Sequence, residues 1–120
     1  MGLTYVTAKM HGFASSNAVV EDQFLVDTGA IDCMAPASRL HAAGIEIEGR
    51  DSYELADGSL VEYPYGHARI EFMGMKTVGR VIFGDEDAEP ILGVVALETV
   101  GFGVDPVSKT LFKMSAKPLK

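Results

Sequence analysis

A chain of 120 residues, nearly half of them apolar, is long enough to form one domain with a buried core. The formal net charge of -7 argues against a nucleic-acid partner and against anionic membrane surfaces. Cys33 is the only cysteine, which excludes an internal disulfide and favours a reducing compartment. Lys9 and His11 interrupt the apolar residues near the N-terminus, which argues against a secretory signal there. No apolar run is long enough to cross a membrane. We therefore expect a cytoplasmic protein without a membrane partner, with one domain over 1–114 and a loose tail over 115–120.

Two strands are predicted at the start of the chain. The residues over 3–10 and 18–26 favour extended structure. The small and polar residues over 12–17 between them favour a turn. The second strand leads directly to Asp27, where the first chemically informative motif begins.

An apolar run over 24–26 is followed at once by Asp27, Thr28, Gly29 and Ala30. Such a run predicts a strand that is buried on both faces. A carboxylate at the end of that strand is partly desolvated, while a threonine offers a hydroxyl and a glycine allows a sharp turn with an accessible N–H. Aspartate and glycine are also common in ordinary turns. The motif alone therefore predicts either a fixed functional carboxylate or a plain turn.

After this motif we expect a short strand and a short helix. Apolar residues alternate over 31–34, which favours a strand leading away from the turn. Proline suits the first position of a helix and glycine its end, so Pro36 and Gly44 predict a helix over 36–43. Residues 45–50 have mixed character and are expected to form a connection.

A hairpin is predicted around Asp57-Gly58. The runs 52–56 and 59–63 flank this dipeptide, and Asp-Gly between two such runs is a strong hairpin signal. Pro64 and Gly66 are expected to interrupt the returning strand, so that it lies at an edge or protrudes.

The rest of the chain is predicted to be mostly β. Apolar residues recur with helical spacing over 94–100, and Gly101 is expected to end that helix. Strands are expected over 68–72, 78–83, 90–93, 102–104 and 110–114. Many short strands separated by glycine turns are typical of a barrel or a sandwich.

Five features follow one another in a characteristic order. They are the run 24–30, the hairpin at Asp57-Gly58, the segment 74–81 with glycine at both 74 and 79, the triplet 91–93, and the helix 94–100. In this order, over about residues 2–113, the chain resembles the single-lobe, retroviral-type (retropepsin-like) aspartic proteases, in a cellular or bacterial form. The resemblance implies an all-β fold: a closed, mostly antiparallel barrel of the acid-protease type, with a flap hairpin and one or two short helices.

The resemblance also implies an aspartic endopeptidase in which Asp27 is catalytic and Thr28 and Gly29 support the catalytic loop. The sequence holds one Asp-Thr-Gly and the chemistry needs two carboxylates, so the enzyme is expected to be a homodimer with Asp27 of each chain at the twofold axis. Two adjacent carboxylates share a proton, so one activates water and the other protonates the developing oxyanion. This mechanism acts on a peptide or protein substrate and uses neither a metal nor a cofactor.

Further site residues are assigned by the same resemblance. The hydrophobic-hydrophobic-glycine triplet is expected to pack beside the catalytic loop, and it comprises Ile91, Leu92 and Gly93. Asp32 has two open interpretations, a substrate contact at the cleft edge or a turn acid. The expected substrate-binding residues are Gly29, Ala30, Asp32, Asp57 and Gly58.

The sequence departs from the retroviral pattern at Ile31 and Val94. Retroviral members commonly place aspartate and arginine at these two positions. Because both charges are replaced by apolar residues here, we expect an apolar contact in place of the ion pair.

Other functions fit the sequence less well. A phosphatase-type nucleophile would need a second acid at the position of Gly29, and the strand–helix alternation of that class is lacking. Cys33 is expected to be a small buried residue instead of a thiol nucleophile. The three histidines lack metal-ligand spacing. The alternative that stays open is a catalytically silent dimer of the same fold that binds peptides or supports assembly.

Overall fold

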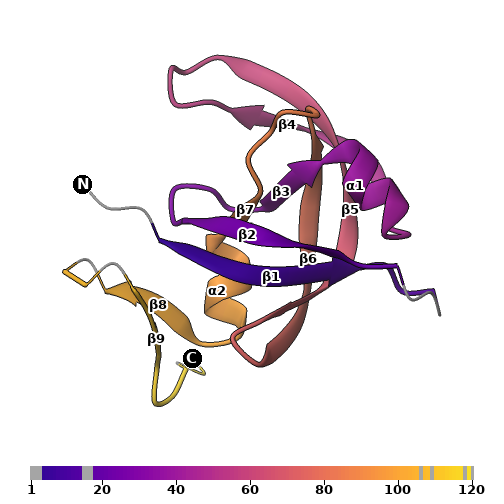
Figure 1. The fold of residues 1–120 in the computed structure, drawn as a ribbon. Helices are drawn as coiled ribbons and strands as arrows, with labels where there is room; N and C mark the ends of the chain where they lie inside the picture. Colours follow the sequence, from indigo (N-terminus) through magenta and orange to yellow (C-terminus); the bar gives the residue numbers. More distant parts are fainter. Residues whose placement is uncertain (1–3, 15–17, 106, 109, 118, 120) are drawn as a thin grey trace.

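The computed structural model describes residues 4–14, 18–105, 107–108, 110–117 and 119, and forms strands and two short helices (Figure 1). In chain order they are β1 (Tyr5–His11), β2 (Val20–Asp27), β3 (Cys33–Pro36), α1 (Ala37–Ala42), β4 (Gly49–Glu54), β5 (Leu60–Phe72), β6 (Met75–Gly84), β7 (Ile91–Gly93), α2 (Val94–Thr99), β8 (Phe102–Asp105) and β9 (Thr110–Lys113). The predicted start of the first strand at Leu3, residues 15–17 of the first turn, and residues 118 and 120 of the tail lie outside the described residues.

Six strands close into a barrel, in the order β1-β2-β7-β3-β6-β5 with β5 pairing back to β1. The β2–β7 and β3–β6 pairs are parallel and the other pairs of the ring are antiparallel. Strand β4 pairs with β5 outside the ring, and β8 with β9 forms a separate antiparallel ribbon (Figure 1). The prediction of a mostly β, closed and mostly antiparallel barrel with short helices is confirmed. In the described part of the chain, neither helix is long and apolar enough to span a membrane.

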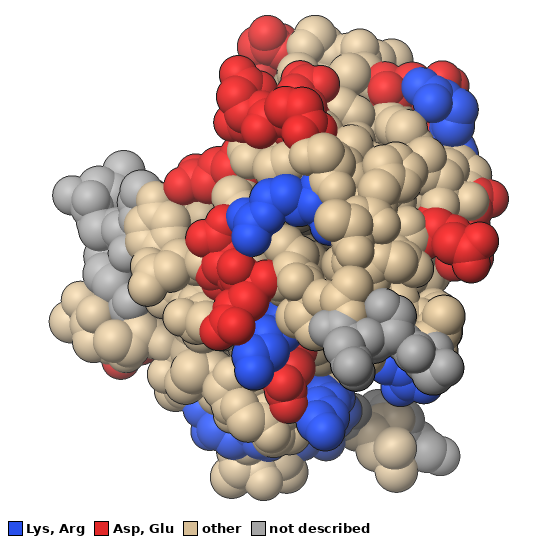
Figure 2. All heavy atoms as spheres, turned by 45° about the vertical axis from the view of Figure 1, so that its right-hand side comes forward, with Lys and Arg blue, Asp and Glu red and all other residues tan. Residues whose placement is uncertain are grey.

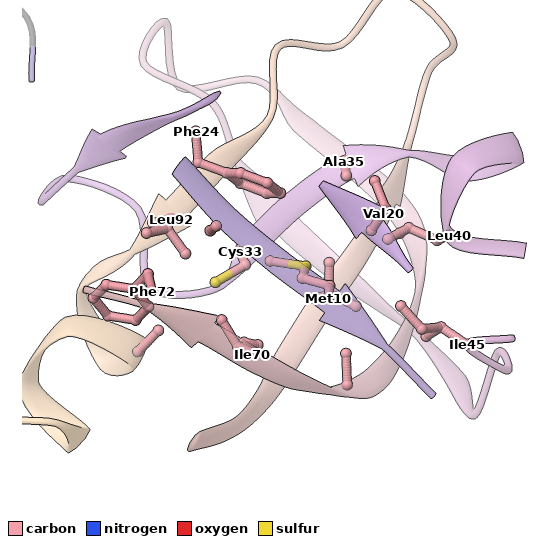
Figure 3. Packing of buried hydrophobic residues seen from close by; sticks show 14 of the residues in the cluster. Met10, Val20, Phe24, Cys33, Ala35, Leu40, Ile45, Ile70, Phe72 and Leu92 are labelled. Atoms are coloured by element: carbon pink, nitrogen blue, oxygen red, sulfur yellow. The ribbon is translucent and has the colours of Figure 1, made fainter. Parts of the chain in front are cut away.

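The core fills the inside of this barrel (Figure 3). Along β5 the alternate residues Ala68, Ile70 and Phe72 are buried, while Arg69 between them is exposed. This period of two is expected for a strand with one face toward a core. Burying each large apolar side chain stabilises the fold by about 1.5–3 kcal/mol. Helix α1 adds Leu40 to the same cluster.

One prediction about β2 is wrong: the run 24–26 is not buried on both faces. Phe24 is fully buried, but Leu25 and Val26 are only half-buried in the single chain. A strand in a closed barrel turns only one face inward, so Leu25 lies on the outer surface. Val26 shares the inner face of Phe24 and packs against the core, but it is only half-buried there.

A second prediction is wrong in part, because β5 runs from Leu60 to Phe72 without interruption at Pro64 or Gly66. The expectation that this strand protrudes is confirmed, since its residues before Tyr65 pair with β4 alone. The carbonyl of Tyr65 accepts a hydrogen bond on the β4 side, so the nitrogen of Pro64 faces the β6 side, where pairing begins only at Tyr65. No hydrogen bond of the ladder is lost. A Cβ at Gly66 would lie 2.2 Å from the carbonyl oxygen of Glu46, so this glycine allows a close approach of backbones.

The predicted hairpin at Asp57-Gly58 is confirmed, although its strands are longer than expected. Strand β4 begins at Gly49, not Ser52, inside the stretch that was expected to be a connection. The N–H of Gly58 donates to the carbonyl of Leu55 at 2.9 Å, and Gly58 has a φ of 86°. This is a turn followed by a left-handed glycine, a common way to close a hairpin.

Candidate functional site

Asp27 is the last residue of β2, and the parallel pairing of β2 with β7 places it opposite Gly93. Its carboxylate is bound by its own loop, because the N–H of Gly29 donates to Oδ1 at 3.0 Å. The N–H of Ala30 donates to the main-chain carbonyl of Asp27 at 3.1 Å. Aspartate commonly binds the backbone two residues ahead in this way. The hydrogen bond from Gly29 holds the carboxylate in place. Asp27 is half-buried, so part of the residue stays accessible.

The loop that follows, residues 28–32, is fixed by the junction of β7 and α2. The N–H of Val94 donates to the carbonyl of Ala30 at 2.8 Å, and the N–H of Val95 donates to the carbonyl of Ile31 at 3.3 Å. Both contacts join main-chain atoms, so they do not depend on the side chains at these positions. The triplet 91–93 therefore lies beside this loop, because β7 pairs with β2 and leads directly into these two contacts.

Gly93 makes this arrangement sterically possible. A Cβ at this position would lie 2.5 Å from the carbonyl oxygens of both Ile31 and Asp32. Carbon and oxygen atoms cannot approach this closely without displacement of the backbone. The loop therefore packs directly onto glycine, at a distance that any other residue would prevent.

Cys33 lies behind the loop as a buried residue, as expected. The N–H of Gly93 donates to its Sγ at 3.5 Å. Burial raises the pKa of the Cys33 thiol to about 11, so the thiol is protonated at neutral pH. Its position supports the loop and does not favour a nucleophile.

The outer surface of the loop is open in the single chain. Thr28 and Gly29 are exposed, and Ile31 is 67% exposed. Most of Ile31 therefore lies in solvent, and its expected apolar contact with Val94 stays a prediction. Val95, in the first turn of α2, is also exposed. Exposed apolar residues thus lie next to the half-buried carboxylate.

Asp32 binds a tyrosine of the hairpin, a role that neither interpretation of this residue included. The hydroxyl of Tyr53, on β4, donates to Oδ2 of Asp32 at 2.9 Å. Burial and the hydrogen bond to Asp32 together raise the pKa of Tyr53 to about 12, against a lowering by Arg80. The hairpin is therefore joined directly to the residue that ends the 28–32 loop.

Arg80, on β6, is the second residue of this site that the sequence analysis missed. Its guanidinium lies 3.7 Å from the ring centroid of Tyr65, and Nη1 donates to Oδ2 of Asp51 at 3.1 Å. The alternation of side chains along β6 indicates that Arg80 points outward. There it lies beside His67, its partner on β5. Locating the partners of Arg80 required the register of β4 on β5.

Asp57 and Gly58 lie in the turn that joins β4 to β5, at the outer end of the hairpin (Figure 1). The side chain and the N–H of Ser59 both donate to Asp57, and these hydrogen bonds lower the pKa of its carboxyl. Within the described residues, no hydrogen bond or ion pair joins this tip to the 28–32 loop. Acidic side chains gather at the same upper end of the molecule (Figure 2).

No protein-family model matches this chain, and a search of curated proteins finds no match either.

Proposed function

We propose that the protein is a homodimeric, retropepsin-like aspartic endopeptidase in which each chain contributes one Asp27. The observation that carries this proposal is the state of the Asp27 carboxylate. It is half-buried at the end of a barrel strand, bound by the N–H of Gly29, and followed by a loop that packs onto Gly93. Such a carboxylate is held in one position, as catalysis requires.

The order of strands around the loop supports an acid-protease type of barrel. Strand β7 lies between β2 and β3, the two strands that the catalytic loop joins. The hairpin of β4 and β5 projects from the ring and suits a flap over an extended peptide. Backbone groups of such a flap can bind the main chain of a peptide as a strand does.

The exposed surface next to Asp27 supports the dimer. Ile31 and Val95 leave apolar area in solvent, and a second copy related by a twofold axis would cover the same area on both chains. This arrangement would bring the two Asp27 carboxylates together. The two groups would then share one proton, because like charges at short distance do not both ionise easily.

The mechanism follows from this shared proton. The ionised Asp27 takes a proton from a bound water, and that water attacks the carbonyl carbon of the peptide bond. The protonated Asp27 donates to the carbonyl oxygen as negative charge develops there. Thr28 holds the two loops in register across the axis, and Gly29 leaves main-chain groups accessible to the substrate.

The test is cleavage of a mixed peptide library between mildly acidic and neutral pH, with Asp27→Asn as the inactive variant. We expect the wild type to cleave. The cleavage rate of the variant should be lower by a factor of about 10²–10⁴ or more, since it loses an essential acid–base group. Asp87→Asn is the matched control, because it makes the same change at an exposed aspartate of the loop between β6 and β7. Sedimentation equilibrium checks the dimer.

A folded, dimeric protein that cleaves no peptide over this pH range would contradict the protease. The fold would then serve as a peptide-binding or assembly module, which peptide binding without turnover would reveal. A strictly monomeric protein that cleaves would contradict the shared pair of Asp27 residues.

A further inference from the structure

The hairpin needs a polar anchor, because its outer part is not held by the barrel. Pairing between β5 and β6 ends at Tyr65, so residues 49–64 pair only within the hairpin. The apolar residues near its tip, Leu55 and Leu60, are 47% and 75% exposed and supply no core. A two-stranded hairpin without a packed face is marginally stable and free to move.

Among the described residues, two side-chain hydrogen bonds join this hairpin to the barrel. Tyr53 donates to Asp32 at 2.9 Å, and Arg80 donates to Asp51 at 3.1 Å. Tyr53 and Asp51 are two residues apart on β4 and therefore share one face of the hairpin. That face is turned toward the 28–32 loop, because Tyr53 reaches Asp32 from it.

From this geometry we propose that the hydrogen bond between Tyr53 and Asp32, here called the hairpin latch, sets the position of the hairpin above Asp27. Tyr53 is a positioning residue in this scheme, and the inference rests on the proposed protease function. Arg80 holds the hairpin beside the latch, since its guanidinium stacks on Tyr65 and donates to Asp51.

The latch is well placed because Asp32 cannot move independently of the catalytic loop. The carbonyl oxygens of Ile31 and Asp32 pack onto Gly93, and Gly93 pairs with Asp27. The hairpin is thus joined to a rigid point instead of a mobile one. The free enzyme would hold its hairpin close to the position that binds a peptide.

This predicts an effect on substrate binding more than on chemistry. If the latch breaks, a smaller fraction of the enzyme has the hairpin in place, and apparent affinity falls by that fraction. A hydrogen bond to a charged group contributes about 1.5–3 kcal/mol, so we expect KM to rise about tenfold or more in Tyr53→Phe. We expect kcat to change much less, because the bound peptide itself holds the hairpin.

The first measurement does not depend on activity. Hydrogen exchange of the backbone amides over 49–63 should become about tenfold faster in Tyr53→Phe, as the same hydrogen bond is lost. Tyr63→Phe is the matched control, since Tyr63 lies in the same hairpin and pairs with Asp51. We expect the amide exchange of the hairpin in this variant to equal that of the wild type. Asp32→Ala should act like Tyr53→Phe, and the double variant should add nothing further.

Each result decides one of the two proposals. Unchanged exchange in a folded Tyr53→Phe, or full additivity with Asp32→Ala, would overturn the latch. A lower KM would also overturn it, because the contact would then obstruct the substrate. Faster exchange in a protein that cleaves nothing would keep the latch and reject the protease, while cleavage with unchanged exchange and KM would do the reverse.

Discussion

The 28–32 loop and the hairpin are two halves of one candidate site, but they are held by different kinds of contact. Main-chain hydrogen bonds from Val94 and Val95, and close packing on Gly93, fix the loop. Side chains of Tyr53 and Arg80 hold the hairpin. The loop is therefore sensitive to changes of backbone volume, whereas the hairpin is sensitive to changes of side-chain chemistry.

The largest effect is expected from Gly93→Ala. The new Cβ would lie 2.5 Å from two main-chain oxygens, neither of which can rotate away. We expect a loss of about 3 kcal/mol or more in the free energy of unfolding, at the upper end of overpacking effects. Urea denaturation measures it.

Gly79→Ala is the matched control on β6. There the nearest atom is the flexible Cδ1 of Ile70 at 3.1 Å, so we expect a much smaller loss. Equal losses in the two variants would contradict a loop held by main-chain packing at Gly93.

A smaller effect is expected from Arg80→Met. This change removes the contact with Asp51 and the stacking on Tyr65 while keeping much of the apolar stem. We expect a loss of about 1 kcal/mol in the free energy of unfolding and faster amide exchange in the hairpin.

Arg50→Met serves as its control. It breaks the exposed ion pair with Glu62 inside the hairpin, and such surface pairs contribute little. If Arg50→Met loosened the hairpin as much as Arg80→Met, anchoring by Arg80 would be rejected.

The smallest effect concerns alkaline pH. The pKa of Tyr53 is about 12 in the folded protein and 10 as its ordinary value, so the folded state holds this proton more tightly. The resulting stabilisation is complete below pH 10 and is lost as the pH rises from 10 toward 12. Because the side chain is partly exposed, solvent screening limits this loss to about 1 kcal/mol.

Unfolding measured against pH in wild type and Tyr53→Phe isolates this contribution from other groups that titrate in the same window. The wild type should lose more stability than the variant between pH 10 and 12. Parallel curves would show that Tyr53 ionises as an exposed tyrosine does.

The same division between local and distant contacts explains what the sequence could predict. The loop around Asp27 and the hairpin turn at Asp57-Gly58 carry local signals, since a few adjacent residues determine each of them. The continuous course of β5 through Pro64 could not be predicted, because it depends on which neighbour the proline nitrogen faces. The contact between Tyr53 and Asp32 depends on pairings far apart in the chain, so composition and spacing hold no signal for it.

The closure of the barrel has a consequence for how the chain folds. Strand β1 pairs with its neighbour β2 and also with β5, so β1 has no free edge once β5 is in place. During synthesis, one edge of β1 stays unpaired until Phe72, the last residue of β5, has left the ribosome. Pairing across so long a stretch of chain is slow, and an open strand edge favours association between chains. Nascent chains that stop before β5 should therefore be the species most prone to aggregate.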